Sequence, residues 1–187
     1  MLNFLDIAGS IFGFLATLCY IRVNILGWPL GLIAIIIDVI LNFKQGIYGN
    51  MGLQFIYFAL SLYGWYQWKY ANNKAGLPIR NLLKKELITL VLFAIVGFIP
   101  IFMLLRFYAA SDIPLLDSGI VIISLLAQWM VCKKIIECWY LWFIADALLV
   151  GLYAVKGIPV HAALFFVYTG MAVAGYITWK KQLKINH

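Results

Sequence analysis

Two tryptophans and one acid stand out inside a long apolar stretch of this sequence. Trp139, Trp142 and Asp146 are spaced i, i+3 and i+7, so all three side chains lie on one face of a helix. A carboxylate at the centre of a bilayer costs about 2.5 to 3.5 kcal/mol and usually faces a bundle interior or a wet cavity. Two indole rings beside an acid can stack on a flat nitrogen-containing ring and attract its positive charge. The three residues therefore predict a binding site for a small, cationic heterocycle.

The composition places the helix that carries these residues in a membrane. Of 187 residues, 65% are apolar and only 11% are charged, which is too little polar surface for a soluble domain. No alternation at strand period recurs, so helices must satisfy the backbone in lipid. The sequence predicts an all-α integral membrane protein. Its net charge of +7 indicates membrane topology and contact with lipid headgroups rather than binding to nucleic acid.

Seven apolar stretches have about the length that crosses the hydrocarbon core as a helix. The predicted segments are 3–21, 25–42, 51–68, 87–107, 117–132, 138–155 and 160–179. The long connection between the third and the fourth contains several charges and a Gly-Leu-Pro turn, so we expect an exposed linker there. Eleven of the 14 Lys and Arg residues lie on the side of the carboxyl terminus. The positive-inside rule therefore predicts a cytoplasmic carboxyl terminus and an external amino terminus.

The chain also repeats itself. Residues 24–70, shifted by 111 positions, fall without a gap on residues 135–181, with 15 identities in 47 positions. The identical pairs include Trp28 and Trp139, Gly46 and Gly157, Gly64 and Gly175, and Trp68 and Trp179. The alternative is that apolar helices resemble one another through composition alone.

Duplication predicts the organisation of the whole chain. The units are a first three-helix repeat at 1–68, a cytoplasmic linker at 69–86, a linking transmembrane helix at 87–107, and a second repeat with a cytoplasmic tail at 108–187. Because one helix separates them, both repeats cross the membrane in the same direction, and parallel repeats of this kind hold a substrate near the midplane. We expect a three-plus-one-plus-three arrangement that rocks to give alternating access.

Six further polar residues inside the predicted segments are candidates to line a central cavity: Asp38, Asn42, Gln54, Tyr57, Gln128 and Tyr168. Asp38 and Asn42 are i and i+4 on one helix face, and Gln54 and Tyr57 are i and i+3 on another. For each amide, a structural hydrogen bond between helices is an equal alternative. Asp38 could instead lie toward a helix end near water.

The sequence gives little support for catalysis. It has two histidines and three cysteines without metal-ligand spacing, and it has no HExxH or GxSxG motif. We therefore expect no catalytic residues, no metal and no cofactor. A membrane scaffold and an ion channel remain as alternatives to a transporter. A scaffold would not need Trp139, Trp142 and Asp146 on a common face, and a channel would need a filter sequence that is not evident.

Seven helices in a three-plus-one-plus-three duplication, together with the Trp-x-x-Trp pattern at Trp139 and Trp142, resemble the Pnu family of bacterial vitamin transporters. The resemblance covers nearly the whole chain. It implies a fold similar to that of the SWEET sugar transporters, a bacterial inner-membrane location and a homotrimer. It also implies that the vitamin passes down its gradient and is retained by a cytoplasmic vitamin kinase. In that family the positions of Trp139, Trp142 and Asp146 belong to the substrate pocket.

The sequence departs from the nicotinamide riboside branch of this family at one pocket position. Asp146 stands where that branch has Asn, which replaces a neutral amide with an acceptor-only group when ionised. Thiamine carries a permanent thiazolium charge, and the chain begins without the longer amino-terminal segment of the riboside branch. These features favour thiamine as the transported vitamin. Nicotinamide riboside, which is also a cation, is the alternative.

Overall fold

The computed structural model describes residues 2–44, 48–71, 77–107 and 113–185 and contains seven helices there. They are α1 (Leu2–Ile21), α2 (Gly27–Lys44), α3 (Tyr48–Tyr70), α4 (Lys84–Phe107), α5 (Pro114–Cys132), α6 (Cys138–Val155) and α7 (Pro159–Ile185). The predicted all-α fold is confirmed. Gly46 of the predicted repeat and residues 72–76 of the predicted linker lie outside the described residues.

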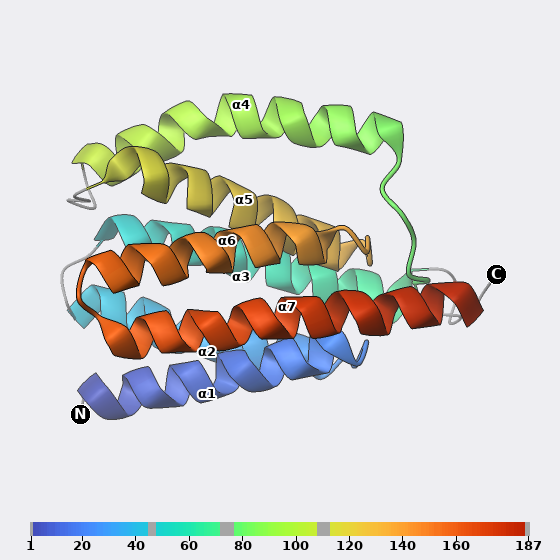
Figure 1. The fold of residues 1–187 in the computed structure, drawn as a ribbon, viewed down its shortest axis with the longest axis horizontal. Helices are drawn as coiled ribbons and strands as arrows, with labels where there is room; N and C mark the ends of the chain where they lie inside the picture. The colour runs from blue at the N-terminus through green and yellow to red at the C-terminus, as the bar shows by residue number, and fades with distance from the viewer. Residues whose placement is uncertain (1, 45–47, 72–76, 108–112, 186–187) are drawn as a thin grey trace.

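The helices run antiparallel in sequence order and pack side by side along one long axis (Figure 1). α1 packs on α2, which packs on α3, and α5 packs on α6, which packs on α7. Contacts of α3 with α5 and of α1 with α7 join these two groups. α4 packs mainly on α5 at the edge of the bundle, far from α1 (Figure 1). α1, α3, α5 and α7 all finish at the end where the chain terminates, which we call the carboxyl-terminal end.

The outer surface of the bundle is apolar, as contact with lipid requires. On α4, Phe93 and Val96 are 67% and 71% exposed, and Phe166 on α7 is 71% exposed. In the described residues, six helices are long and apolar enough to cross a membrane. α3 is not among them because tyrosines, glutamines and a serine lower its hydropathy. That α3 spans the bilayer therefore stays a prediction.

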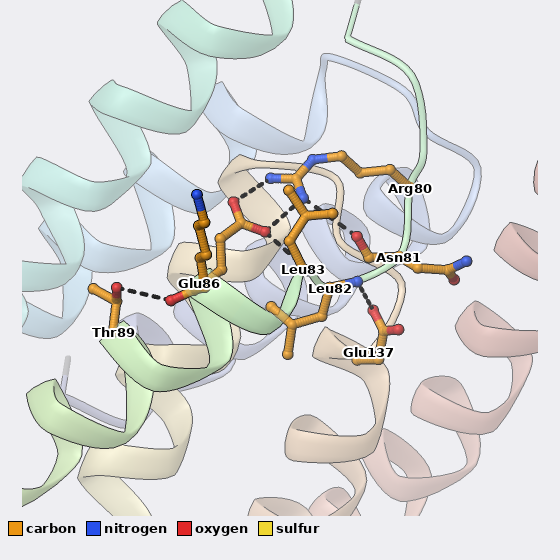
Figure 2. Close-up of polar contacts among 8 residues, drawn as sticks. Arg80, Asn81, Leu82, Leu83, Glu86, Thr89 and Glu137 are labelled. Carbon is orange, nitrogen blue, oxygen red and sulfur yellow. Dashed lines mark hydrogen bonds and ion pairs between the residues drawn. The ribbon is translucent and has the colours of Figure 1, made fainter.

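Residues 79–82 of the linker between α3 and α4 are docked on the bundle, which corrects the expectation of an exposed linker for this part. Ile79 is only 7% exposed. The backbone N–H of Arg80 donates to the carbonyl of Lys134, and the N–H of Ile136 donates to the carbonyl of Arg80, both at 3.0 Å. The Glu137 carboxylate accepts the N–H of Leu82 at 3.0 Å (Figure 2). The segment was misjudged because its charges mark it as polar, whereas these backbone contacts depend on the tertiary fold.

A second set of contacts continues from the linker into α4. Arg80 makes two hydrogen bonds with the carboxylate of Glu86, each 2.7 Å long (Figure 2). A bidentate pair of this geometry fixes orientation as well as contributing energy. The pair raises the pKa of the Arg80 guanidinium, because the hydrogen bonds favour its charged form. The linker therefore connects the start of α4 to the turn between α5 and α6.

Positions 111 residues apart share structural features. Val23 and Lys134 have positive φ values of 56° and 50°, which are uncommon for residues other than glycine. Trp28 and Trp139 are the second residues of α2 and α6, are 0% and 3% exposed, and have indole N–H groups that no described residue accepts. These pairs support the predicted duplication. The parallel three-plus-one-plus-three arrangement stays a prediction.

Candidate functional site

A cavity of about 270 Å³ lies between the two groups of helices. Its walls come from α1, α2 and α3 on one side and from α5, α6 and α7 on the other, and α4 contributes no lining residue. Most of the wall is apolar, with a few polar side chains facing inward. This combination is typical of a pocket that buries a small molecule and orients it through a few polar contacts.

The three residues singled out in α6 all line this cavity. Trp139 lies near the carboxyl-terminal end, and Asp146 lies about 10 Å further along the helix axis because each residue rises 1.5 Å. Asp146 is only 7% exposed, and its carboxyl group has no hydrogen-bond partner among the described residues. A buried carboxylate without a partner is costly, so a bound cation or hydrogen-bond donor would stabilise it. The local helical spacing alone was sufficient to predict this shared wall.

Trp139 is held in place by the backbone of α7. A Cβ atom placed on Gly175 would lie 2.5 Å from two atoms of the Trp139 ring, so only glycine permits this approach. The Trp139 ring also packs against the ring of Trp179: the two centroids lie 5.4 Å apart and the interplanar angle is 90°. The edge-to-face geometry is favourable for aromatic rings. α7 therefore fixes the position of the indole at the floor of the cavity.

Three more of the predicted residues line the cavity: Tyr57 of α3 on the opposite side from α6, and Gln128 of α5 and Tyr168 of α7 on the same side as α6. The amide of Gln128 is 3.5 Å from the hydroxyl of Ser61, which is the long limit for a hydrogen bond. The Tyr168 hydroxyl lies against α1, where a Cβ on Gly13 would be 3.3 Å from its oxygen. The cavity thus offers hydroxyl and amide groups in addition to the indoles and the acid.

The remaining three predicted residues, Asp38, Asn42 and Gln54, do not line the cavity. Asp38 follows the lining residue Ile35 by one helical turn and faces α1 beside Gly9. The amide of Asn42 donates to the carbonyl of Asp38 within its own helix, at 2.7 Å. Gln54 precedes Tyr57 by one turn. Each therefore shares a face with a lining residue but lies one or two turns too far along its helix.

Four polar or aromatic lining residues were not predicted: Thr17, Tyr20, Ser61 and Phe165. The internal repeat contained a signal for one of them, because a shift of 111 positions takes Gln128 back to Thr17. The same shift takes Asp146 to Ile35 and Tyr168 to Tyr57, both of which line the cavity. In the described residues, no group of His, Cys, Asp and Glu side chains is arranged to hold a metal ion.

Comparison with known proteins assigns the chain to a family. The sequence model of the family described as nicotinamide mononucleotide transporters matches residues 3–181. The chain belongs to this family. The expected membership of the Pnu transporters is thereby confirmed.

Characterised relatives of the family match over nearly the full chain. The nicotinamide riboside transporter PnuC of Escherichia coli is 26% identical over 204 residues, covering 95% of this chain and 85% of the relative. The riboflavin/roseoflavin transporter RibM of Streptomyces davaonensis is 24% identical over 178 residues, covering 93% and 83%. The crystal structure of the vitamin B3 transporter PnuC has the same fold. It matches with a TM-score of 0.78 at 22% identity, over 99% of this chain and 84% of the other.

Proposed function

We propose that this protein carries a cationic, nitrogen-heterocyclic vitamin across the bacterial inner membrane, and that nicotinamide riboside is its first substrate. The observation that carries the proposal is the buried Asp146 carboxyl group, which has no hydrogen-bond partner in the described part of the chain, in a cavity walled by Trp139 and Trp142. A pyridinium ring between the indoles would gain stacking and cation–π attraction, and the acid would neutralise its charge. The hydroxyl and amide groups of Tyr57, Tyr168 and Gln128, which also line the cavity, suit a ribose and a carboxamide.

Thiamine is the second candidate. The sequence favoured it because Asp146 replaces the amide expected in the riboside branch. The relatives named as nicotinamide riboside transporters support the riboside instead, and both vitamins present a cationic ring to the same carboxylate. Asp146 therefore supports a cationic ring and does not choose between the two.

Several further properties belong to the same proposal. Transport runs down the gradient of the vitamin, and a cytoplasmic vitamin kinase retains the product. The carboxyl terminus is cytoplasmic, which the excess of Lys and Arg at that end supports. The protein assembles as a homotrimer, as the family resemblance implies. Uptake into vesicles with and without an imposed pH gradient tests the mode of transport, since only a carrier coupled to protons would accumulate the vitamin above its external concentration when the gradient is imposed.

The deciding experiment measures binding and uptake in Asp146→Asn, with Asp38→Asn as the matched control. Tryptophan fluorescence of purified protein reports binding, because both indoles of the site would contact the ligand. Hydrogen bonds to charged groups are stronger than neutral ones by about 1 to 1.5 kcal/mol, so we expect about a tenfold loss of affinity for thiamine in Asp146→Asn. The loss for nicotinamide riboside should be smaller, because the riboside branch has an amide at this position. Asp38 lies outside the cavity lining, so its change should alter affinity less than threefold.

Competition between the two vitamins ranks them. Unlabelled nicotinamide riboside should displace labelled riboside from wild-type protein at lower concentration than thiamine does. The reverse order would make thiamine the first substrate. Equal effects of Asp146→Asn and Asp38→Asn, or no effect of either, would remove the proposed charge pairing.

A further inference from the structure

Five aromatic rings pack together at the carboxyl-terminal end of the cavity. We call them the indole cluster: Trp28, Trp68, Trp139, Trp179 and Tyr20. All four tryptophans are at most 5% exposed. Trp28 and Trp68 meet edge to face at 5.4 Å, as do Trp139 and Trp179, and Trp68 lies 6.3 Å from Trp179. Tyr20 joins the cluster 4.9 Å from Trp28 and 6.0 Å from Trp68.

The cluster begins at the cavity wall, where Tyr20 and Trp139 belong to the lining, and continues beyond it with Trp68 and Trp179. On α3, Trp68 follows the lining residue Ser61 by seven positions, and on α7, Trp179 follows the lining residue Ala172 by seven. Seven helical residues rise about 10 Å, so both rings lie two turns further toward the carboxyl-terminal end. A solute in the cavity can reach that end only if these rings separate, because buried, mutually packed rings leave no path between them.

Two hydrogen bonds cross between the helix groups at this level. The indole N–H of Trp68 donates to the carbonyl of Val131 at the end of α5, and the indole N–H of Trp179 donates to the carbonyl of Tyr20 at the end of α1, both at 3.0 Å. The shift of 111 positions takes the donor Trp68 to Trp179 and the acceptor Tyr20 to Val131, so the two bonds occupy equivalent positions of the repeat. Each joins one group to the other, and each acceptor residue also lines the cavity.

Each acceptor carbonyl keeps a second partner when its indole leaves. The N–H of Val23 donates to the Tyr20 carbonyl, and the N–H of Lys134 donates to the Val131 carbonyl, both at 3.0 Å. Losing the indole therefore does not leave a buried carbonyl without any hydrogen bond, which would be the costly outcome. The ammonium group of Lys134 also lies 4.5 Å from the centre of the Trp68 ring and covers it from the loop side.

We propose that Trp68 and Trp179 form the gate of the cavity toward the carboxyl-terminal end, and that their two crossed hydrogen bonds hold it closed. In this state the cavity is sealed on that side, and opening requires both indoles to leave the carbonyls of the opposite helix group. The proposal rests on the transport function proposed above, and it assigns the two residues a gating role without contact to the substrate.

The test measures how fast a cysteine inside the cavity reacts with a membrane-impermeant maleimide added on the carboxyl-terminal side of oriented vesicles. The reporter is Ser61→Cys in a background without the three native cysteines, chosen because the exchange is nearly isosteric. Trp68→Phe keeps a ring and removes the hydrogen-bond donor. We expect labelling about fivefold faster in Trp68→Phe, which corresponds to about 1 kcal/mol for one neutral hydrogen bond. Labelling from the opposite side should not change.

Trp28→Phe is the matched control. It makes the same exchange in the same cluster, but no described residue accepts the Trp28 N–H, so labelling should change less than twofold. Equal acceleration in both variants, or none in Trp68→Phe, would overturn the gate. If Trp68→Phe does not give monodisperse protein, Trp179→Phe removes the related bond and must meet the same expectation. The labelling needs no substrate, so its failure is distinguishable from failure of the uptake and binding experiments.

Discussion

Replacing Gly175 by alanine should displace the indole at the floor of the cavity. The added Cβ would lie 2.5 Å from Cδ2 and Cε2 of Trp139 and 2.6 Å from Cε3. Carbon atoms pack at about 3.5 Å or more, so the ring must retreat by about 1 Å. It cannot retreat toward the carboxyl-terminal end without striking Trp179, which already meets it edge to face. The ring therefore shifts relative to the site of stacking, or the helices separate.

Overpacking of a well-packed interface costs about 1 to 3 kcal/mol of stability. For binding, a shift of about 1 Å at a stacking residue should weaken affinity about tenfold, because binding groups must hold their geometry to within about 0.5 Å. Both effects can be read from one purified sample, by thermal unfolding in detergent and by fluorescence titration with nicotinamide riboside.

Two glycine variants separate displacement of the indole from a general effect of alanine. Gly170→Ala lies on the same helix with no atom within 4 Å of the added Cβ, so stability and binding should be retained. Gly64→Ala would place a Cβ 2.0 Å from the Trp28 ring, which does not line the cavity. It should lower stability with less loss of affinity than Gly175→Ala. If Gly175→Ala binds the riboside as well as wild type does, Trp139 is not a binding surface.

Three further predictions concern residues around the site. Glu137→Ala removes the acceptor of the Leu82 N–H, so proteolysis of the linker should be faster in this variant than in wild type. Glu137→Gln keeps an acceptor oxygen and should be cleaved at the wild-type rate. Equal cleavage rates in the two variants would contradict docking through this contact. Burial lowers the pKa of Lys134 to about 8, while the unfolded chain keeps that proton to about pH 10.4. Between about pH 8 and pH 10.4 the unfolded state binds more protons than the folded state, so the free energy of unfolding should rise with pH relative to that of Lys134→Met. Thermal unfolding of both proteins at stepped pH measures this difference. If both melting temperatures change with pH in parallel, the lowered pKa is wrong. Asn42→Ala should bind nicotinamide riboside with an affinity within twofold of wild type, because the amide of Asn42 is hydrogen-bonded within its own helix. A larger loss in fluorescence titration would indicate that Asn42 contributes to the binding site.

Local spacing predicted the parts of the site that lie on one helix. Trp139, Trp142 and Asp146 share a wall because helical geometry alone brings i, i+3 and i+7 together. The positions of the helices were predicted for a similar reason, since the length and apolarity of a span are local properties. Membership of the family followed from the same residues.

The parts that depend on contacts between helices were not predictable in this way. Asp38 and Asn42 share a helical face with lining residues, but the cavity ends before it reaches them. Nothing local shows that Gly175 packs on Trp139, because the contact joins residues on different helices. The docking of Ile79 and Arg80 could not be predicted either, because it joins segments that lie far apart in the sequence. The internal repeat carried the additional information, since it relates Thr17 to Gln128 and Trp68 to Trp179.

A structure of this protein determined with nicotinamide riboside bound would show whether the cavity is the binding site. We expect the pyridinium ring against Trp139 and Trp142, with its charge facing the Asp146 carboxylate and its ribose toward Tyr57 and Tyr168. Ligand density outside this cavity, or a ligand inside it that does not contact the Asp146 carboxyl group, would refute the proposed site.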